Sequence, residues 1–159
     1  MNSNGAVFPD GDHPTVTTGT YPVELGGSYS IPRIAVWQQE LDPRIAGNIF
    51  VAMVDGVFVI SWEGIPQYGG LAENGLNFQV ALHPGGNIEI HWSDGNPPTD
   101  QDTFGFAGIK DEAGVAVPAT RFPFGNEAYP AGEAPSFPSN QCRIFVVTAM
   151  GNYIEWPWT

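Results

Sequence analysis

The chain has 159 residues, of which 42% are hydrophobic and 13% aromatic, enough to build the core of one domain and too many for a disordered segment. Five Lys and Arg stand against 17 Asp and Glu, so the formal net charge is −12. The few cations are scattered, which argues against nucleic acid and anionic membrane surfaces as partners. No apolar run approaches the roughly 18 to 20 residues of a membrane helix.

The N-terminal region differs in composition from the rest of the chain. Residues 1–22 are polar and rich in turn-forming residues, so we expect an extended arm there and a single domain over 23–159. The first residues lack the positive and apolar regions of a secretory signal. Residues 34–41 predict either a short helix or a strand that runs into a turn at Asp42 and Pro43.

The segments that follow predict β-hairpins. The pair Asp55–Gly56 between two apolar runs is the clearest signal, because a two-residue hairpin turn needs positive φ at its centre. The expected strand pairs are 48–54 with 57–63, 77–83 with 87–92 and 143–149 with 152–156, and two further strands are expected near 104–109 and 115–121. Short strands at regular spacing predict an all-β fold, an antiparallel β-sandwich built from hairpins.

Alternation along these strands predicts which side chains enter the core. In the first hairpin Phe58, Ile60 and Trp62 fall on one face, and the second hairpin alternates in the same way. We therefore expect Trp62 and Trp92 in the core, although exposed tryptophans could also stack on sugars.

An acidic loop follows the second hairpin. Asp94, Asp100 and Asp102 lie within 93–103, and oxygen-rich loops can hold calcium. The spacing does not match the helix–loop–helix calcium pattern, so an ordinary acidic turn is the alternative. We expect no other cofactor.

The second long loop, 122–141, contains four prolines and three phenylalanines. Its aromatic side chains could cover the sheet as a lid or form an exposed contact surface. Trp156 and Trp158 flank a proline near the C-terminus and would suit a partner's pocket. The aromatic residues expected to contact a partner are Phe8, Tyr21, Phe137, Trp156 and Trp158.

No catalytic constellation is evident. The histidines lack metal-ligand spacing, although His91 shares the outward face of its strand with Glu89 and could hydrogen-bond to it. Ser61 lies within a strand and outside any nucleophile motif. Cys142 is the single cysteine, so no internal disulfide can form; it is either a small buried residue or a reactive thiol. A catalytic pair of carboxylates, as in glycosidases, would meet only in the folded chain, so the sequence leaves this alternative open.

Part of the chain resembles a known family. The residues that carry the likeness are Gly47, Asn48, Phe58, Val59, Ile60, Ser61, Trp62, Ile65, Pro66, Tyr68, Asn77, Phe78, Gln79, Val80, Leu82, Ile88 and Ile90. Through these residues and their spacing, residues 34–115 resemble the nidogen-like extracellular domain. The resemblance implies a β-rich, non-catalytic module that makes adhesive or structural contacts in exterior proteins, without a cofactor.

These observations predict a non-enzymatic structural or interaction protein that builds or decorates an exterior assembly. The favoured assembly is a phage virion, with the chain acting as a capsid decoration, head-fibre or tail-associated subunit at the virion surface. Its partner would be a protein, in a homo-oligomer or virion shell, with no nucleic acid and no membrane insertion. The alternatives are a secreted or cell-surface adhesion module that binds protein or glycan, and a carbohydrate-active enzyme.

Overall fold

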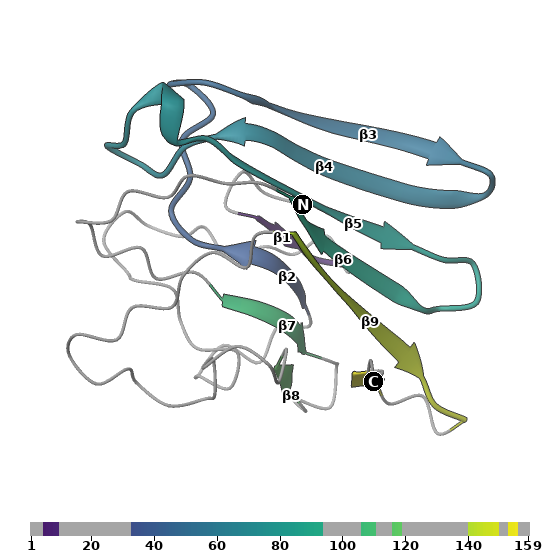
Figure 1. Ribbon diagram of the computed structural model, residues 1–159. Helices are drawn as coiled ribbons and strands as arrows, with labels where there is room; N and C mark the ends of the chain where they lie inside the picture. The colour runs from purple at the N-terminus through teal and green to yellow at the C-terminus, as the bar shows by residue number, and fades with distance from the viewer. Residues whose placement is uncertain are drawn as a thin grey trace.

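A computed structural model describes residues 5–9, 33–93, 106–110, 116–118, 140–149 and 153–155. Within them the chain forms two antiparallel sheets, ordered β1-β2-β7-β8 and β10-β9-β6-β5-β4-β3 (Figure 1). The elements are β1 (Ala6–Val7), β2 (Arg33–Gln38), β3 (Asn48–Val54), β4 (Val57–Ile65), the 3-10 turn η1 (Ala72–Asn74), β5 (Leu76–Leu82), β6 (Ile88–Trp92), β7 (Phe106–Lys110), β8 (Ala116–Pro118), β9 (Gln141–Val147) and β10 (Tyr153–Glu155). The predicted all-β sandwich is confirmed.

The three predicted hairpins form, the first two in the register that their turns predict and the third shifted by one residue, with Tyr153 opposite Val147. Asp55 and Gly56 have φ values of 49° and 81°, so the β3–β4 turn uses the left-handed conformation that Asp-Gly favours. The second hairpin joins β5 to β6, and the third joins β9 to β10. Residues 33–38 form the strand β2, which decides between the helix and the strand left open by the sequence. In the part of the chain described, no helix is long and apolar enough to cross a membrane.

The core lies between the two sheets and includes three buried tryptophans. Trp62 stacks on Phe78 with ring centroids 5.2 Å apart, and both belong to the six-stranded sheet. Trp92, in β6, donates its Nε1–H to the carbonyl oxygen of Val36 in β2 at 2.9 Å. This bond joins the two sheets inside the core, where an unpaired polar group is costly. Trp62 and Trp92 are core residues, as predicted.

Glycines allow close backbone approach where β3, β4 and β5 meet. Gly47 precedes β3 with φ +82°, and a Cβ there would lie 2.5 Å from the carbonyl carbon of Gly64. A Cβ on Gly75 would lie 2.6 Å from the same atom. The β4–β5 register shifts between Trp62 and Ile65, so Gly64 lies in an irregular segment of β4. The backbone amide of Gly64 donates a hydrogen bond to Asn77 Oδ1 at 2.8 Å. Side chains at Gly47 and Gly75 would therefore prevent the backbones at this end of the sheet from approaching so closely.

The start of the predicted N-terminal arm belongs to the sandwich. Ala6 and Val7 form β1 and pair with β2, and Phe8 beside them is also buried. Gly5 (φ +73°) lies so close to the backbone of Trp37 that a Cβ would overlap it. The carbonyl oxygen of Gly5 accepts a hydrogen bond from the amide of Val36 at 2.9 Å. The rest of the arm and its boundary at residue 22 lie outside the described residues.

Candidate functional site

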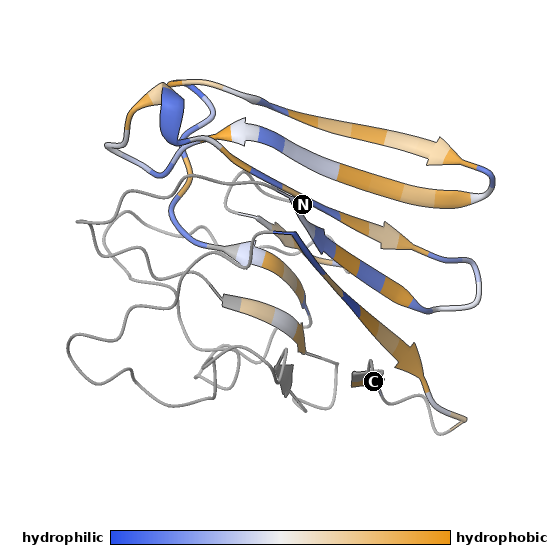
Figure 2. Cartoon of the chain, viewed as in Figure 1, coloured by the Kyte–Doolittle hydropathy of each residue, from blue (hydrophilic) through white to orange (hydrophobic). Residues whose placement is uncertain are grey.

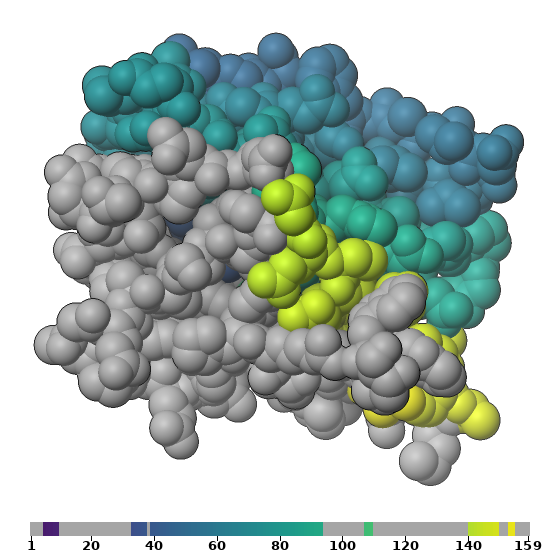
Figure 3. Space-filling view, in the orientation of Figure 1, coloured from purple at the N-terminus to yellow at the C-terminus, as the bar shows by residue number. Residues whose placement is uncertain are grey.

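The first candidate site is the outer edge of the six-stranded sheet, which we call the β3 edge and define as β3 together with Phe58. Among the described residues, β3 pairs only with β4, and its other side faces outward. In Figure 3 the blue atoms of β3 and β4 form the upper margin of the molecule. The exposed large apolar side chains there are Phe50 (50%), Val51 (45%), Met53 (65%), Val54 (54%) and Phe58 (37%).

Both faces of β3 are exposed because the sheet extends past its cover. Val51 and Met53 pair with Ile60 and Phe58 and therefore share the core-facing side of β4. Ile60 in β4 is buried, whereas Val51 and Met53, one strand further out in β3, are exposed. The opposite sheet thus covers the central strands and leaves β3 overhanging. Figure 2 shows β3 and the first half of β4 mostly in orange, the colour of hydrophobic residues.

The β3 edge lacks the features that usually prevent edge strands from pairing. Natural edge strands carry Lys, Pro, inward-pointing charges or bulges, or are very short. β3 has seven residues, no charged residue and no proline, and its register with β4 is continuous from Asn48 to Val54. In a chain of net charge −12, an uncharged apolar strand at a sheet edge is a candidate contact surface.

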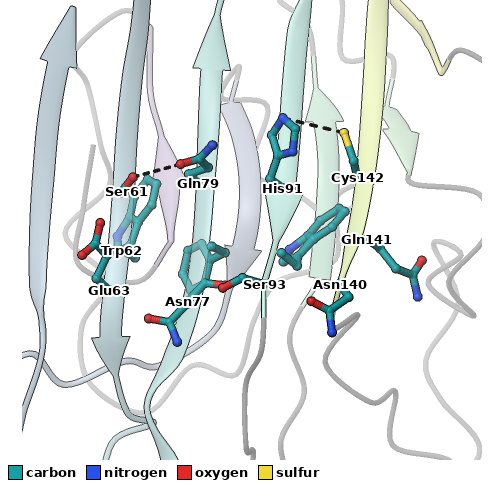
Figure 4. Close-up of a pocket in the computed structure, with 12 residues that line it drawn as sticks. Ser61, Trp62, Glu63, Asn77, Gln79, His91, Ser93, Asn140, Gln141 and Cys142 are labelled. Atoms are coloured by element: carbon teal, nitrogen blue, oxygen red, sulfur yellow. Dashed lines mark hydrogen bonds between the residues drawn. The ribbon is translucent and has the colours of Figure 1, made fainter. Parts of the chain in front are cut away.

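The second candidate site is a groove on the outer face of the same sheet, with a volume of about 510 Å³. Ser61, Gln79, His91 and Cys142 are successive register partners on β4, β5, β6 and β9, so they form one row across the sheet (Figure 4). Phe50 continues this row onto β3. The groove, which we call the outer groove, is also lined by the polar residues Glu63, Asn77, Ser93, Asn140 and Gln141.

Hydrogen bonds order the side chains of this row. Ser61 Oγ donates to Gln79 Oε1 at 3.2 Å, and His91 Nε2 lies 3.1 Å from Glu89 Oε2. The hydrogen bond that the sequence left open between His91 and Glu89 is therefore present. His83 Nε2 lies 2.8 Å from the other oxygen of Glu89, a close electrostatic contact that lacks hydrogen-bond alignment. One carboxylate thus serves two histidines.

Cys142 Sγ lies 3.7 Å from His91 Nε2, but its surroundings disfavour a nucleophilic thiolate. Burial raises the pKa of the Cys142 thiol, and the nearby charge of Glu89 raises it further, while Arg143 lowers it. A reactive cysteine needs the opposite shift. The thiol is only partly buried. Within the described residues, no three His, Cys, Asp or Glu side chains are placed to hold a metal ion.

The three arginines whose side chains are described are either buried or paired with a carboxylate. Arg33 and Arg143 are buried, and desolvation lowers the pKa of Arg33. Arg44 is exposed but binds Asp42, with Nη2 2.7 Å from Oδ2, and this hydrogen-bonded pair lowers the pKa of the Asp42 carboxyl. A basic surface of the kind that binds phosphates is therefore not assembled from these three arginines.

The predicted partner and calcium residues fall mostly outside the part of the chain that is described. Phe8 is 6% exposed and packs beside β1, so in this conformation it offers little contact area, and its role as a partner contact stays a prediction. The remaining predicted residues, Tyr21, Phe137, Trp156, Trp158, Asp94, Asp100 and Asp102, lie outside the described residues, as does 122–139 of the long loop.

Sequence reasoning did not single out the β3 edge or the outer groove. The uncharged run from Asn48 to Val54 was a detectable signal for the edge, but it also suits a buried strand. The groove joins residues 61 to 142, which only strand order brings together. No protein-family model matches this chain, and neither curated proteins nor solved structures yielded a match. The nidogen-like resemblance therefore rests on its motif alone.

Proposed function

We propose that this protein is a non-enzymatic subunit that builds or decorates an exterior assembly, and that the assembly is a phage-type particle. The observation that carries the proposal is the β3 edge, a seven-residue uncharged strand with apolar side chains on both faces. Such an edge binds an extended strand through its backbone and adjacent side chains through its apolar surface. A subunit that occupies a fixed place among neighbours needs this kind of contact.

The charge distribution supports an interaction with protein. Acidic residues outnumber basic ones by 17 to 5, which keeps free subunits apart and soluble. The β3 edge carries no charge, so a neighbour that docks there meets no charged side chain of this strand. Docking then buries the apolar strand and leaves the acidic surface in solvent, an arrangement suited to the outside of a particle.

The proposal is tested by locating the protein in its source organism. Particles released on lysis are banded in a density gradient, and each fraction is analysed by quantitative mass spectrometry. We expect the chain in the particle band, at a fixed ratio to the major shell protein. Recovery only in particle-free fractions would refute the virion assignment.

A secreted or cell-surface adhesion module that binds glycan is the second candidate, and the outer groove favours it. Hydroxyl and amide groups from Ser61, Asn77 and Gln79 line a groove on an open sheet face, and such groups can hydrogen-bond to sugar hydroxyls. The groove's aromatic residues, including Trp62 and Trp92, are buried and provide no stacking surface.

Glycan-array binding distinguishes this second candidate. Binding by the wild-type chain that is lost in Gln79→Ala and kept in Leu71→Ala would support it, because Leu71 is exposed and does not line the groove. Repeating the array with a chelator tests the calcium prediction for the 93–103 loop. No binding by any variant would reject the glycan assignment.

A further inference from the structure

We propose that the occupant of the β3 edge is a second copy of this chain, paired antiparallel through β3 about a two-fold axis at Val51. The two six-stranded sheets would then continue into one sheet across the interface. The inference rests on the proposed function in taking β3 as the contact surface, and it adds the identity and register of the partner.

The backbone of β3 suits this symmetry. The two-residue turn makes Val54 and Val57 a hydrogen-bonded pair, and such pairs alternate along an antiparallel ladder. The amide and carbonyl groups of Ile49, Val51 and Met53 are therefore directed away from β4. These positions are symmetric about Val51, so a two-fold axis there pairs every outward N–H with an outward carbonyl of the second copy.

The side chains also match in this register. Val51 faces its own copy, Ile49 faces Met53, and the large Phe50 faces the small Ala52. Because faces are preserved, the exposed core-facing side chains of one copy meet those of the other, and so do the outer ones. Because β3 has no charged residue, this pairing places no like charges opposite each other.

The size of the contact predicts weak, reversible association. Half of a phenylalanine side chain is about 100 Å², so the five exposed side chains of the β3 edge offer roughly 400 Å² per copy, against about 800 Å² in a standard stable interface. A dimer should therefore form as the protein concentration rises, and it would be strengthened where neighbouring contacts hold two copies together in an assembly.

Light scattering and sedimentation over a concentration series up to millimolar test the proposal. We expect a monomer–dimer equilibrium whose dissociation constant rises at least about tenfold in Val51→Lys, because two lysines would face each other across the axis. Val51 is exposed, so this change should leave the fold intact. The matched control is Ile154→Lys, which adds the same charge at β10, the opposite edge of the same sheet; it should leave the equilibrium unchanged.

Cross-linking tests the register. In a Cys142→Ser background, Val51→Cys should be captured as a dimer by a short bismaleimide, because the two positions are directly opposite. Val54→Cys should not, because its two copies lie six strand positions apart, about 20 Å. Equal capture of both variants would overturn the Val51 axis.

The outcomes separate this inference from the proposed function. A strict monomer at all concentrations, with the chain still present in the particle band, overturns self-pairing and leaves the assembly role with a foreign partner at β3. A Val51-centred dimer from a chain found only in particle-free fractions keeps the inference and overturns the virion assignment.

Discussion

Replacing Gly47 with alanine should destabilise the protein far more than replacing Gly56, although the two glycines have nearly identical backbones. Their φ values are +82° and +81°, so both substitutions place an L side chain in the left-handed region. That conformation costs about 1–2 kcal/mol, and the reduced freedom of the unfolded chain returns about 0.4–1 kcal/mol. The backbone contribution is therefore the same, on the order of 1 kcal/mol, for both variants.

The surroundings of the two glycines differ. A Cβ at Gly56 would meet nothing within 4 Å, because the β3–β4 turn projects into solvent. A Cβ at Gly47 would overlap the carbonyl oxygen of Glu63 and lie 2.5 Å from the carbonyl carbon of Gly64. Those atoms belong to backbone that is held in the sheet, so relief requires β3 to move away from β4. Such overpacking costs typically 1–3 kcal/mol, and we expect Gly47→Ala to cost about 2–4 kcal/mol in total.

Urea denaturation followed by the fluorescence of the buried tryptophans measures this difference. Gly47→Ala should have a midpoint lower than that of Gly56→Ala by the equivalent of about 2 kcal/mol, or roughly 4–8 °C in Tm. Equal midpoints for the two variants would refute the steric explanation, and would mean that the close approach of β3 to β4 at Gly47 is not maintained in solution.

Three further predictions concern the core and the titratable groups. Trp92→Phe should cost about 1–3 kcal/mol in urea denaturation because it leaves the Val36 carbonyl without its donor; a cost below about 0.5 kcal/mol would mean that this bond does not join the sheets. Because the pKa of Cys142 is raised, the folded state keeps the thiol proton above pH 9, where the unfolded state loses it. The free energy of unfolding should therefore fall as pH rises beyond 9, and Cys142→Ser should remove that part of the decline. Iodoacetamide should likewise alkylate the native thiol more slowly than the unfolded one at pH 8. Because the pKa of Asp42 is lowered by Arg44, the stability from this pair is present above the usual carboxyl pKa and lost as pH falls through the lowered value; NMR titration of Arg44→Ala should show the Asp42 pKa rising, and an unchanged value would contradict the pairing.

The strands and their faces could be predicted from the sequence because both depend on neighbouring residues. Alternation of apolar and polar side chains has the period of an extended backbone, so the core positions of Ile60, Trp62 and Trp92 were recognisable. Positive φ at Asp55 and Gly56 is a local requirement of a two-residue turn. Neighbouring residues did not decide between helix and strand for 34–41. The strand β2 forms because it pairs with β1 and β7, which are distant in sequence.

The candidate sites were decided by tertiary structure. The sequence by itself determined that β3 is an apolar strand, but a continuous apolar run is also the ordinary pattern of a strand buried on both faces. Its exposure depends on strand order, which places β3 at the edge of a sheet that extends beyond its cover. The outer groove likewise needs β9 to pair with β6, which brings Cys142 beside His91 across 51 residues of chain. Long-range pairing of this kind is set by how whole sheets bury their faces, and no local pattern of residues carries that information.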